Sequence, residues 1–158
     1  MKVLLVGECQ AGKTSIAARY VNCKVPGQYT GTLGVDYLDR HVDVKDTNVH
    51  INIWDFSGRT DFLDIRNEFY KEGSIVLLVL DLTTKKAVDT CDLWLKEIKD
   101  NGGSCPIMLV GSKSDSKKIE QDLTKFARER GCTYFEVSAR DNPTSVDQLF
   151  LEVMSIVL

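Results

Sequence analysis

Residues 7–14 carry the pattern with the clearest chemistry, because they read Gly-Glu-Cys-Gln-Ala-Gly-Lys-Thr. This octet matches G-x-x-x-x-G-K-[S/T] in full, and it lies between a strand-like run and a helix-like segment, as that motif requires. The glycines let the backbone curl so that successive N–H groups point inward toward a phosphate. Lys13 would then reach the β- and γ-phosphates, and the Thr14 hydroxyl would bind Mg²⁺. An ordinary strand-to-helix turn is the alternative interpretation.

The elements that position this loop alternate along the chain. Short apolar runs at 3–6, 75–80 and 107–110 are typical of buried parallel strands, and residues 133–137 are predicted to form the last strand. Two further segments alternate apolar and polar residues around Asp46-Thr47-Asn48, which predicts a hairpin. These hairpin strands are residues 37–44 and 49–54, with the first at a half-solvated edge. Apolar residues at helical spacing predict helices over 13–21, 88–98, 119–127 and 146–154.

This order of elements predicts an α/β fold. We expect a six-stranded, mostly parallel sheet with one antiparallel edge strand and helices on both faces. In such sheets ligands bind beyond the carboxyl ends of the strands. The chemistry is therefore predicted in the loops after Val6, Trp54, Val110 and Val137.

Composition narrows the class of protein. The chain has 158 residues, of which 43% are hydrophobic and 27% charged, so we expect a single compact domain over 1–158 rather than disorder. The net charge of -3 includes no basic excess, which predicts no nucleic-acid partner. The longest apolar run, 75–80, is too short to span a bilayer, and the N-terminus lacks a signal-peptide pattern. We expect a cytoplasmic monomer that reaches membranes through partners.

Cysteine and histidine usage predicts no metal or disulfide framework. The five cysteines are odd in number and form no Cys-x-x-Cys pair, so we expect free thiols. His41 and His50 stand isolated on strand-like segments, which predicts that neither ligates a metal.

Two later loops carry a resemblance. Residues 111–115 read Gly-Ser-Lys-Ser-Asp and residues 138–140 read Ser-Ala-Arg. Together with residues 7–14, which form a P-loop motif, these segments resemble the Ras superfamily of small GTPases, whose base-reading motifs run N/T-K-x-D and S-A-K. The resemblance covers essentially the whole chain. It implies a P-loop GTPase domain that binds GTP or GDP with Mg²⁺. The nucleotide contacts it implies come from Gln10, Ala11, Gly12, Lys13, Thr14, Ser15, Thr32, Gly58, Ser112, Lys113, Asp115, Ser138, Ala139 and Arg140.

The same resemblance assigns roles around the nucleotide. Asp115 would accept from guanine N1–H and the exocyclic amine, a donor pair that suits a carboxylate and that adenine does not offer. Lys113 would lie along the base, and the backbone of Ala139 would donate to guanine O6. A solvated polar loop is the alternative for residues 112–115.

Two segments resemble the switches of this superfamily. Residues 26–37 resemble switch I, in which Thr32 would close on Mg²⁺ and the γ-phosphate, and Thr32 to Tyr37 look specifically like a Rab. Residues 54–58 resemble the W-D-x-x-G motif that begins switch II, here about 55–72. Asp55 would hold Mg²⁺ through water, and the Gly58 N–H would sense the γ-phosphate. Such loops are ordered by the γ-phosphate and released when it leaves, so both would bind effectors.

The sequence departs from the family at the catalytic step. Arg59 stands where most Ras-like proteins have the glutamine that orients the attacking water. Arginine has no hydrogen-bond acceptor for this task, so we predict very slow intrinsic GTP hydrolysis. The other residues that we assign to catalysis are Lys13 and Gly58. A surface role for Arg59 is favoured over an arginine finger in cis. Cys9, at a P-loop position that many relatives keep as glycine, would crowd the catalytic water; it is either inert or, beside a helix N-terminus, reactive.

Other departures concern the base and the subfamily. Ser112 replaces the usual asparagine and loses reach, and Val25 replaces an aromatic residue that stacks on guanine, so both should weaken nucleotide retention. Residues 65–72, Ile-Arg-Asn-Glu-Phe-Tyr-Lys-Glu, resemble V-R-N-E-F-Y-K-D of the RJL group of Rab-like proteins, some of which carry a DnaJ-like domain. About half of the apolar residues at 62–70 should face the core, and the others an effector. No C-terminal prenylation motif precedes Leu158, so we expect no membrane anchor in these residues: either the natural chain continues past Leu158 or the protein lacks a lipid anchor.

Two alternatives to a Rab-like switch remain open from the sequence. One is a pseudo-GTPase scaffold that binds partners regardless of nucleotide, which Arg59, Ser112 and Val25 would allow. The other is a P-loop phosphotransferase acting on ATP, which would need an arginine-rich lid that is not evident. The switch interpretation implies effectors in membrane traffic or signalling.

Overall fold

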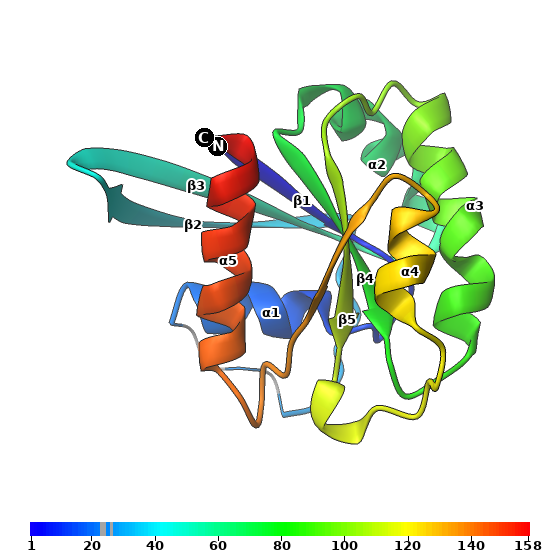
Figure 1. Ribbon diagram of the computed structural model, residues 1–158. Coiled ribbons are helices and arrows are strands. Elements are labelled where there is room, and N and C mark those ends of the chain that lie inside the picture. The colour runs from blue at the N-terminus through cyan, green and yellow to red at the C-terminus, as the bar shows by residue number, and fades with distance from the viewer. Residues whose placement is uncertain (23–24, 26) are drawn as a thin grey trace.

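A six-stranded sheet forms the middle of a three-layer α/β fold in the computed structural model, which describes residues 1–22, 25 and 27–158 (Figure 1). Its strands are β1 Lys2–Val6, β2 Val35–Val44, β3 Thr47–Phe56, β4 Ile75–Asp81, β5 Ile107–Ser112 and β6 Thr133–Glu136. They are ordered β2-β3-β1-β4-β5-β6. β2 pairs antiparallel with β3, and the other neighbouring pairs are parallel. The predicted fold class is confirmed.

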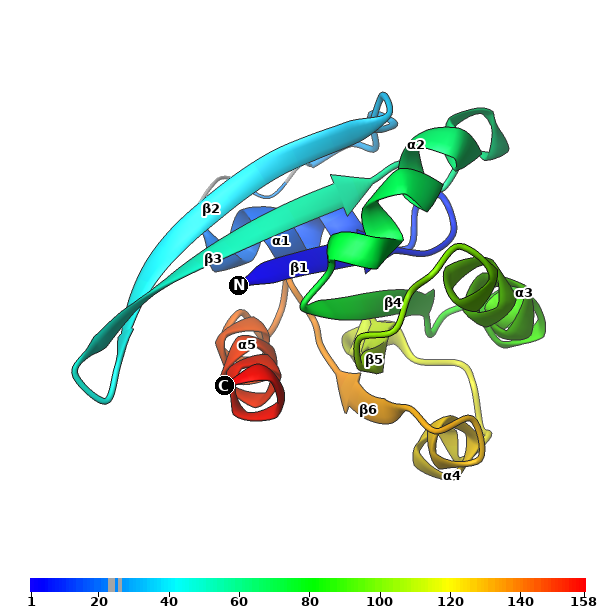
Figure 2. The same ribbon diagram turned by 90° about the horizontal axis from the view of Figure 1, so that it is seen from above.

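Helices cover both faces of this sheet (Figure 2). α1 (Lys13–Tyr20) and α5 (Thr144–Val157) pack on one face. α2 (Leu63–Phe69), α3 (Lys86–Asp100) and α4 (Leu123–Arg128) lie on the other, with short 3-10 turns at Thr60–Phe62, Tyr70–Glu72 and Ser114–Ser116. Among the residues described, no helix has the length and apolar character needed to cross a membrane.

The central strands are apolar throughout because both of their faces are covered. In β1, Val3 and Leu5 join the core beneath α1 and α5, while Leu4 and Val6 join the core beneath α3 and α4. All four side chains are fully buried. Each such side chain stabilises the fold by roughly 1.5–3 kcal/mol through removal of apolar surface from water. Continuous apolar runs therefore mark the strands that hold the sheet together.

Two local predictions were wrong, and one helix was missed. The hairpin turn lies at Lys45 and Asp46, whose φ angles of 45° and 66° fit a two-residue turn, so the predicted centre at 46–48 was late. α4 begins at Leu123, because Asp122 caps it by accepting from the Lys125 N–H at 3.0 Å; Ile119 is buried but precedes the helix. α2 was not assigned from the sequence.

The described cysteines, Cys9, Cys91, Cys105 and Cys132, are free thiols, as expected. Cys23 lies outside the described residues, as does Pro26 at the start of the predicted switch I.

A buried ion pair attaches α2 to α3. The side chain of Arg66 is 2% exposed, and it donates to both carboxylate oxygens of Glu97, at 2.9 and 3.1 Å. The Tyr70 hydroxyl also donates to Glu97, at 2.6 Å. Arg66 Nη1 donates in addition to the carbonyls of Ser57 (2.9 Å) and Arg59 (2.7 Å). One guanidinium thereby holds the backbone that follows β3 against α3.

We predict that Glu97→Ala lowers the free energy of unfolding by about 3–5 kcal/mol, because it leaves the Arg66 charge buried without its carboxylate. Urea denaturation in buffers of fixed composition measures this loss. Asp100→Ala is the matched control, since it removes an exposed ion pair with Lys96 on the same helix and should cost less than about 1 kcal/mol. Equal losses in the two variants would contradict the special role of the buried pair.

Candidate functional site

A cavity of about 380 Å³ opens at the carboxyl ends of the parallel strands. The predicted nucleotide contacts that line it are Gln10, Ala11, Gly12, Lys13, Thr14, Ser15, Thr32, Gly58, Ser112, Lys113, Asp115, Ser138, Ala139 and Arg140. The tertiary structure thus brings together all of the residues that the sequence motifs assigned to one ligand. They come from the loops after β1, β3, β5 and β6 and from the segment before β2.

The loop after β1 wraps around the Lys13 ammonium. Gly12, with a φ of 97°, and Gln10, with a φ of 64°, both lie in the left-handed region, which lets the loop curl tightly. Lys13 is buried, and its Nζ donates to the carbonyls of Gly7 (2.9 Å) and Glu8 (2.7 Å). Burial lowers the pKa of Lys13 to about 8. An anion in the cavity would favour the charged ammonium, so the loop is suited to phosphate.

Oxygen atoms of three segments meet beside this lysine. Asp55 is fully buried, and its Oδ2 accepts a hydrogen bond of 2.5 Å from Thr14 Oγ1. Thr32 Oγ1 lies 3.3 Å from the Thr14 hydroxyl. Burial raises the pKa of Asp55 to about 6, and its Oδ1 has no hydrogen-bond partner among the described residues. A buried carboxylate oxygen without a partner, with two hydroxyls close by, fits the all-oxygen coordination that Mg²⁺ prefers.

The opposite end of the cavity presents a carboxylate. Asp115 accepts from the hydroxyls of Ser138 at Oδ1 (2.6 Å) and of Ser116 at Oδ2 (2.9 Å). These hydrogen bonds lower the pKa of Asp115, so it remains an acceptor at neutral pH. Lys113, with a φ of 57°, extends across the cavity and donates to the Gln10 carbonyl (2.8 Å) and to Asp81 Oδ2 (2.6 Å). The wall beside Asp115 is therefore fixed to the loop after β1.

The Ser112 side chain links β5 to the loop after β1. Its buried hydroxyl donates to the carbonyl of Ala11 at 2.5 Å and lies 3.2 Å from that of Leu80. A serine therefore bridges the end of β5 and the loop after β1, while the expected weakening of nucleotide retention stays a prediction. Val25 is half-buried and does not line the cavity.

The segment after β3 brings its backbone close to the loop after β1. A Cβ on Gly58 would lie 2.5 Å from both the Cys9 nitrogen and the Gly7 oxygen, so glycine alone fits there. The Arg59 side chain is more than half exposed and pairs with Asp61. Gly58 lines the cavity, whereas Arg59 is not among the described residues that line it. Cys9 lines the cavity and is exposed.

Sequence reasoning missed several residues at this site. Ser57, Thr83 and Tyr29 line the cavity, and Asp81 fixes Lys113. Asp81 directly follows the apolar run of β4, so the sequence could have predicted that it lies at the carboxyl edge of the sheet, beside the cavity. Glu8 was also missed as a structural link: it accepts from Trp94 Nε1 at 3.1 Å, which ties the loop after β1 to α3.

Comparison with known proteins agrees with this geometry. A sequence model of the Ras family matches residues 2–158. Ras-related protein Rab-13 of Canis lupus familiaris is 32% identical over 162 residues, which cover 99% of this chain and 79% of that protein. Ras-related protein Rab-7b of Paramecium octaurelia is 31% identical over 163 residues, which cover 96% of this chain and 78% of that protein.

A second kind of relative is longer. DnaJ homolog subfamily C member 27 of Rattus norvegicus is 33% identical over 167 residues, which cover 99% of this chain but 61% of that protein. The chain therefore spans less than two thirds of this relative. The family match covers nearly every residue, and the matched relatives include Rab proteins of two very different organisms. The chain belongs to the Ras family and is a Rab-like small GTPase.

Proposed function

We propose that residues 1–158 act as one G domain, a switch that binds GTP or GDP with Mg²⁺. One observation carries this proposal: the residues assigned to the nucleotide by motif line one cavity, although they lie as far apart in the chain as Gln10 and Arg140. The volume of about 380 Å³ falls within the range of roughly 300–1,000 Å³ that is usual for small-ligand sites. Family membership supports guanine as the base.

The proposed roles follow from the charges in the cavity. The curled backbone of residues 10–15 and the Lys13 ammonium would hold the phosphates, and Asp115 would read the guanine donors. Thr14, Thr32 and, through water, Asp55 would hold Mg²⁺. When bound, this ion would neutralise phosphate charge. The α1 N-terminus adds partial positive charge at the same place, so the protein's own groups favour the phosphates over water.

We further propose that intrinsic GTP hydrolysis is very slow. The Arg59 side chain pairs with Asp61 at the surface, and Arg59 is not among the described residues that line the cavity. A guanidinium has donors but no acceptor, so it cannot take a hydrogen bond from an attacking water. Gly58 keeps its place against the loop after β1, which supports a role for its N–H in sensing the γ-phosphate.

Switches I and II form the proposed surface for effectors. Exposed apolar side chains gather there: Tyr29, Leu33, Tyr37, Leu63 and Ile65. The two segments lie close together, because a Cβ added to Gly34 would be 3.4 Å from Ile65 Cδ1. Exposed apolar residues in one area are typical of protein-binding surfaces. Within residues 62–70, Tyr70 is buried in the core, while Leu63 and Ile65 are exposed. This supports the proposal that part of the segment packs into the core and part binds an effector.

The decisive experiment identifies the nucleotide released when purified protein is denatured. We expect about one guanine nucleotide per chain, resolved by ion-exchange chromatography. Lys13→Ala should weaken GDP binding by about 100-fold or more, because charge-assisted hydrogen bonds to phosphate contribute about 1.5–3 kcal/mol each. Lys45→Ala, in the exposed hairpin turn, is the control and should bind as the wild type does.

Other outcomes discriminate between the alternatives. Released adenine nucleotide would favour the phosphotransferase. An empty protein that also refuses added GTP would favour the scaffold, and so would partner binding that ignores the nucleotide. Unchanged affinity in Lys13→Ala would remove the phosphate assignment.

Base specificity gives a second prediction. Asp115→Asn places an amide donor against the two guanine donors, so GDP should bind at least about tenfold more weakly. Xanthosine diphosphate should gain affinity, because its C2 carbonyl accepts where guanine has an amine. Displacement of a fluorescent GDP analogue measures both. Asp89→Asn, exposed on α3, is the control, and an unchanged preference for GDP over the xanthine nucleotide in Asp115→Asn would refute the assignment.

Hydrolysis supplies a third prediction. Arg59→Gln should raise the single-turnover rate of phosphate release by about tenfold, since one added hydrogen bond of about 1.4 kcal/mol in the transition state has that effect. Arg59→Ala serves as the control, because it removes the guanidinium without adding an acceptor. A rate that rises equally in both variants would show that the arginine obstructs the reaction rather than merely failing to orient water.

A further inference from the structure

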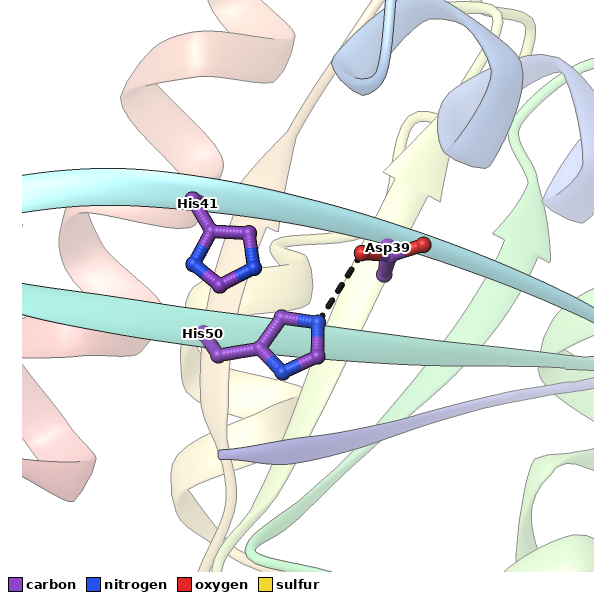
Figure 3. Close-up of side chains that lie close together, drawn as sticks. All are labelled: Asp39, His41 and His50. Atoms are coloured by element: carbon purple, nitrogen blue, oxygen red, sulfur yellow. Dashed lines mark hydrogen bonds and ion pairs between the residues drawn. The ribbon is translucent and has the colours of Figure 1, made fainter.

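His41 and His50 are neighbours across the β2–β3 hairpin, so the expectation that they are isolated was wrong. Strand register places His41 directly opposite His50. Their rings stack with centroids 4.2 Å apart and planes 4° from parallel. Asp39 precedes His41 by two residues and therefore shares its face of the strand. His50 Nε2 and Asp39 Oδ2 are 2.9 Å apart, as the dashed line in Figure 3 marks.

These three side chains offer one set of metal ligands. A ligand atom from each of Asp39, His41 and His50 lies within 4.8 Å of the other two. One ring nitrogen of His41 faces toward His50 and Asp39 (Figure 3). Zinc–nitrogen bonds of about 2.0–2.1 Å place tetrahedral ligands about 3.3 Å apart, so small rotations of these side chains would close the set.

Hydrogen bonds around the set prepare His41 as a ligand. Asn48 Nδ2 donates to Asp43 Oδ1 at 2.8 Å, which turns Asn48 Oδ1 toward His41 Nδ1, also at 2.8 Å. Nδ1 must then carry the proton, which leaves the lone pair on Nε2, the nitrogen that faces the other two ligands. Metal-binding histidines characteristically donate their second N–H to an oxygen acceptor in this way.

The local charge also favours a cation. Asp39 and Asp43 lie on the face that carries both histidines. Arg40 points to the opposite face, where it donates to the Tyr20 carbonyl at 2.7 Å. The carboxylates therefore act on this face without compensation from the arginine between them.

We propose that Asp39, His41 and His50 form a site for a first-row divalent cation of the Zn²⁺ type. Two imidazoles and one carboxylate suit such an ion, and water would complete the coordination. On binding, the ion takes the place of the proton that lies between His50 Nε2 and Asp39 Oδ2. In the neutral ring that proton moves through solvent to His50 Nδ1, so the imidazole stays neutral and the carboxylate stays charged.

This site is separate from the proposed Mg²⁺ site. Asp55 and His50 lie five residues apart on β3, which is about 16 Å along a strand. The cation would join β2 to β3. β2 begins in the proposed switch I, and β3 ends in the proposed switch II. It would stabilise the folded state, because the unfolded chain does not hold the three ligands together.

Zinc titration of the GDP-loaded protein in excess Mg²⁺ tests the proposal, because the nucleotide and its ion are then already in place. We expect one Zn²⁺ per chain by calorimetry, a zinc-dependent rise in Tm, and Co²⁺ absorption bands without thiolate charge transfer. His41→Gln and His50→Gln should each abolish binding, and Asn48→Ala should weaken it by about 10–100-fold. Asp46→Asn, in the adjacent turn, and Cys9→Ser should bind as the wild type does.

GDP binding serves as the check that each variant is folded. Stoichiometric zinc binding that persists in both histidine variants would overturn the proposal, and so would a wild-type Kd no tighter than about 1 mM. Zinc binding that disappears in Cys9→Ser would place the ion at the P-loop thiol instead and would also refute it.

Discussion

The cavity depends on two opposite charges, those of Lys13 at the start of α1 and Asp55 near the end of β3, which are buried without completing each other's hydrogen bonds. The lysine donates to main-chain carbonyls, and one carboxylate oxygen of Asp55 has no partner among the described residues. Burial disfavours both charged forms, which lowers the pKa of Lys13 and raises that of Asp55. A phosphate and a divalent cation would supply what each group lacks, so this edge of the sheet is prepared for the two together.

Helix α3 connects the parts that surround these charges. Trp94 bonds to Glu8 in the loop after β1, and three residues later Glu97 holds Arg66, which in turn holds the carbonyls of Ser57 and Arg59. The backbone that follows β3 is therefore held against α3, while the Arg59 side chain is more than half exposed. Under the proposed function, backbone sensing and side-chain catalysis would be separable here: Gly58 is packed against the loop after β1, whereas the Arg59 guanidinium offers no acceptor for a water.

The hairpin behaves differently from the rest of the sheet. β1, β4 and β5 are buried on both faces, whereas β2 leaves one polar face exposed at the sheet edge. Such an edge strand can carry ligand side chains at every second position, because they need not pack into a core. The proposed zinc site would cross-link this edge strand to β3, which pairs with the buried β1.

The sequence alone determined the fold class and the motif residues that line the cavity, because apolar runs, helical spacing and the motifs at residues 7–14, 54–58, 111–115 and 138–140 are local patterns. It did not show the helix over Leu63–Phe69, whose exposed Leu63 and Ile65 blur the apolar period. Nor did it show the reach of Ser112, the Arg66–Glu97 pair or the meeting of His41 with His50. Each of these depends on the distance between segments remote in sequence, or on a strand register set by a two-residue turn. Tertiary packing alone decides those distances.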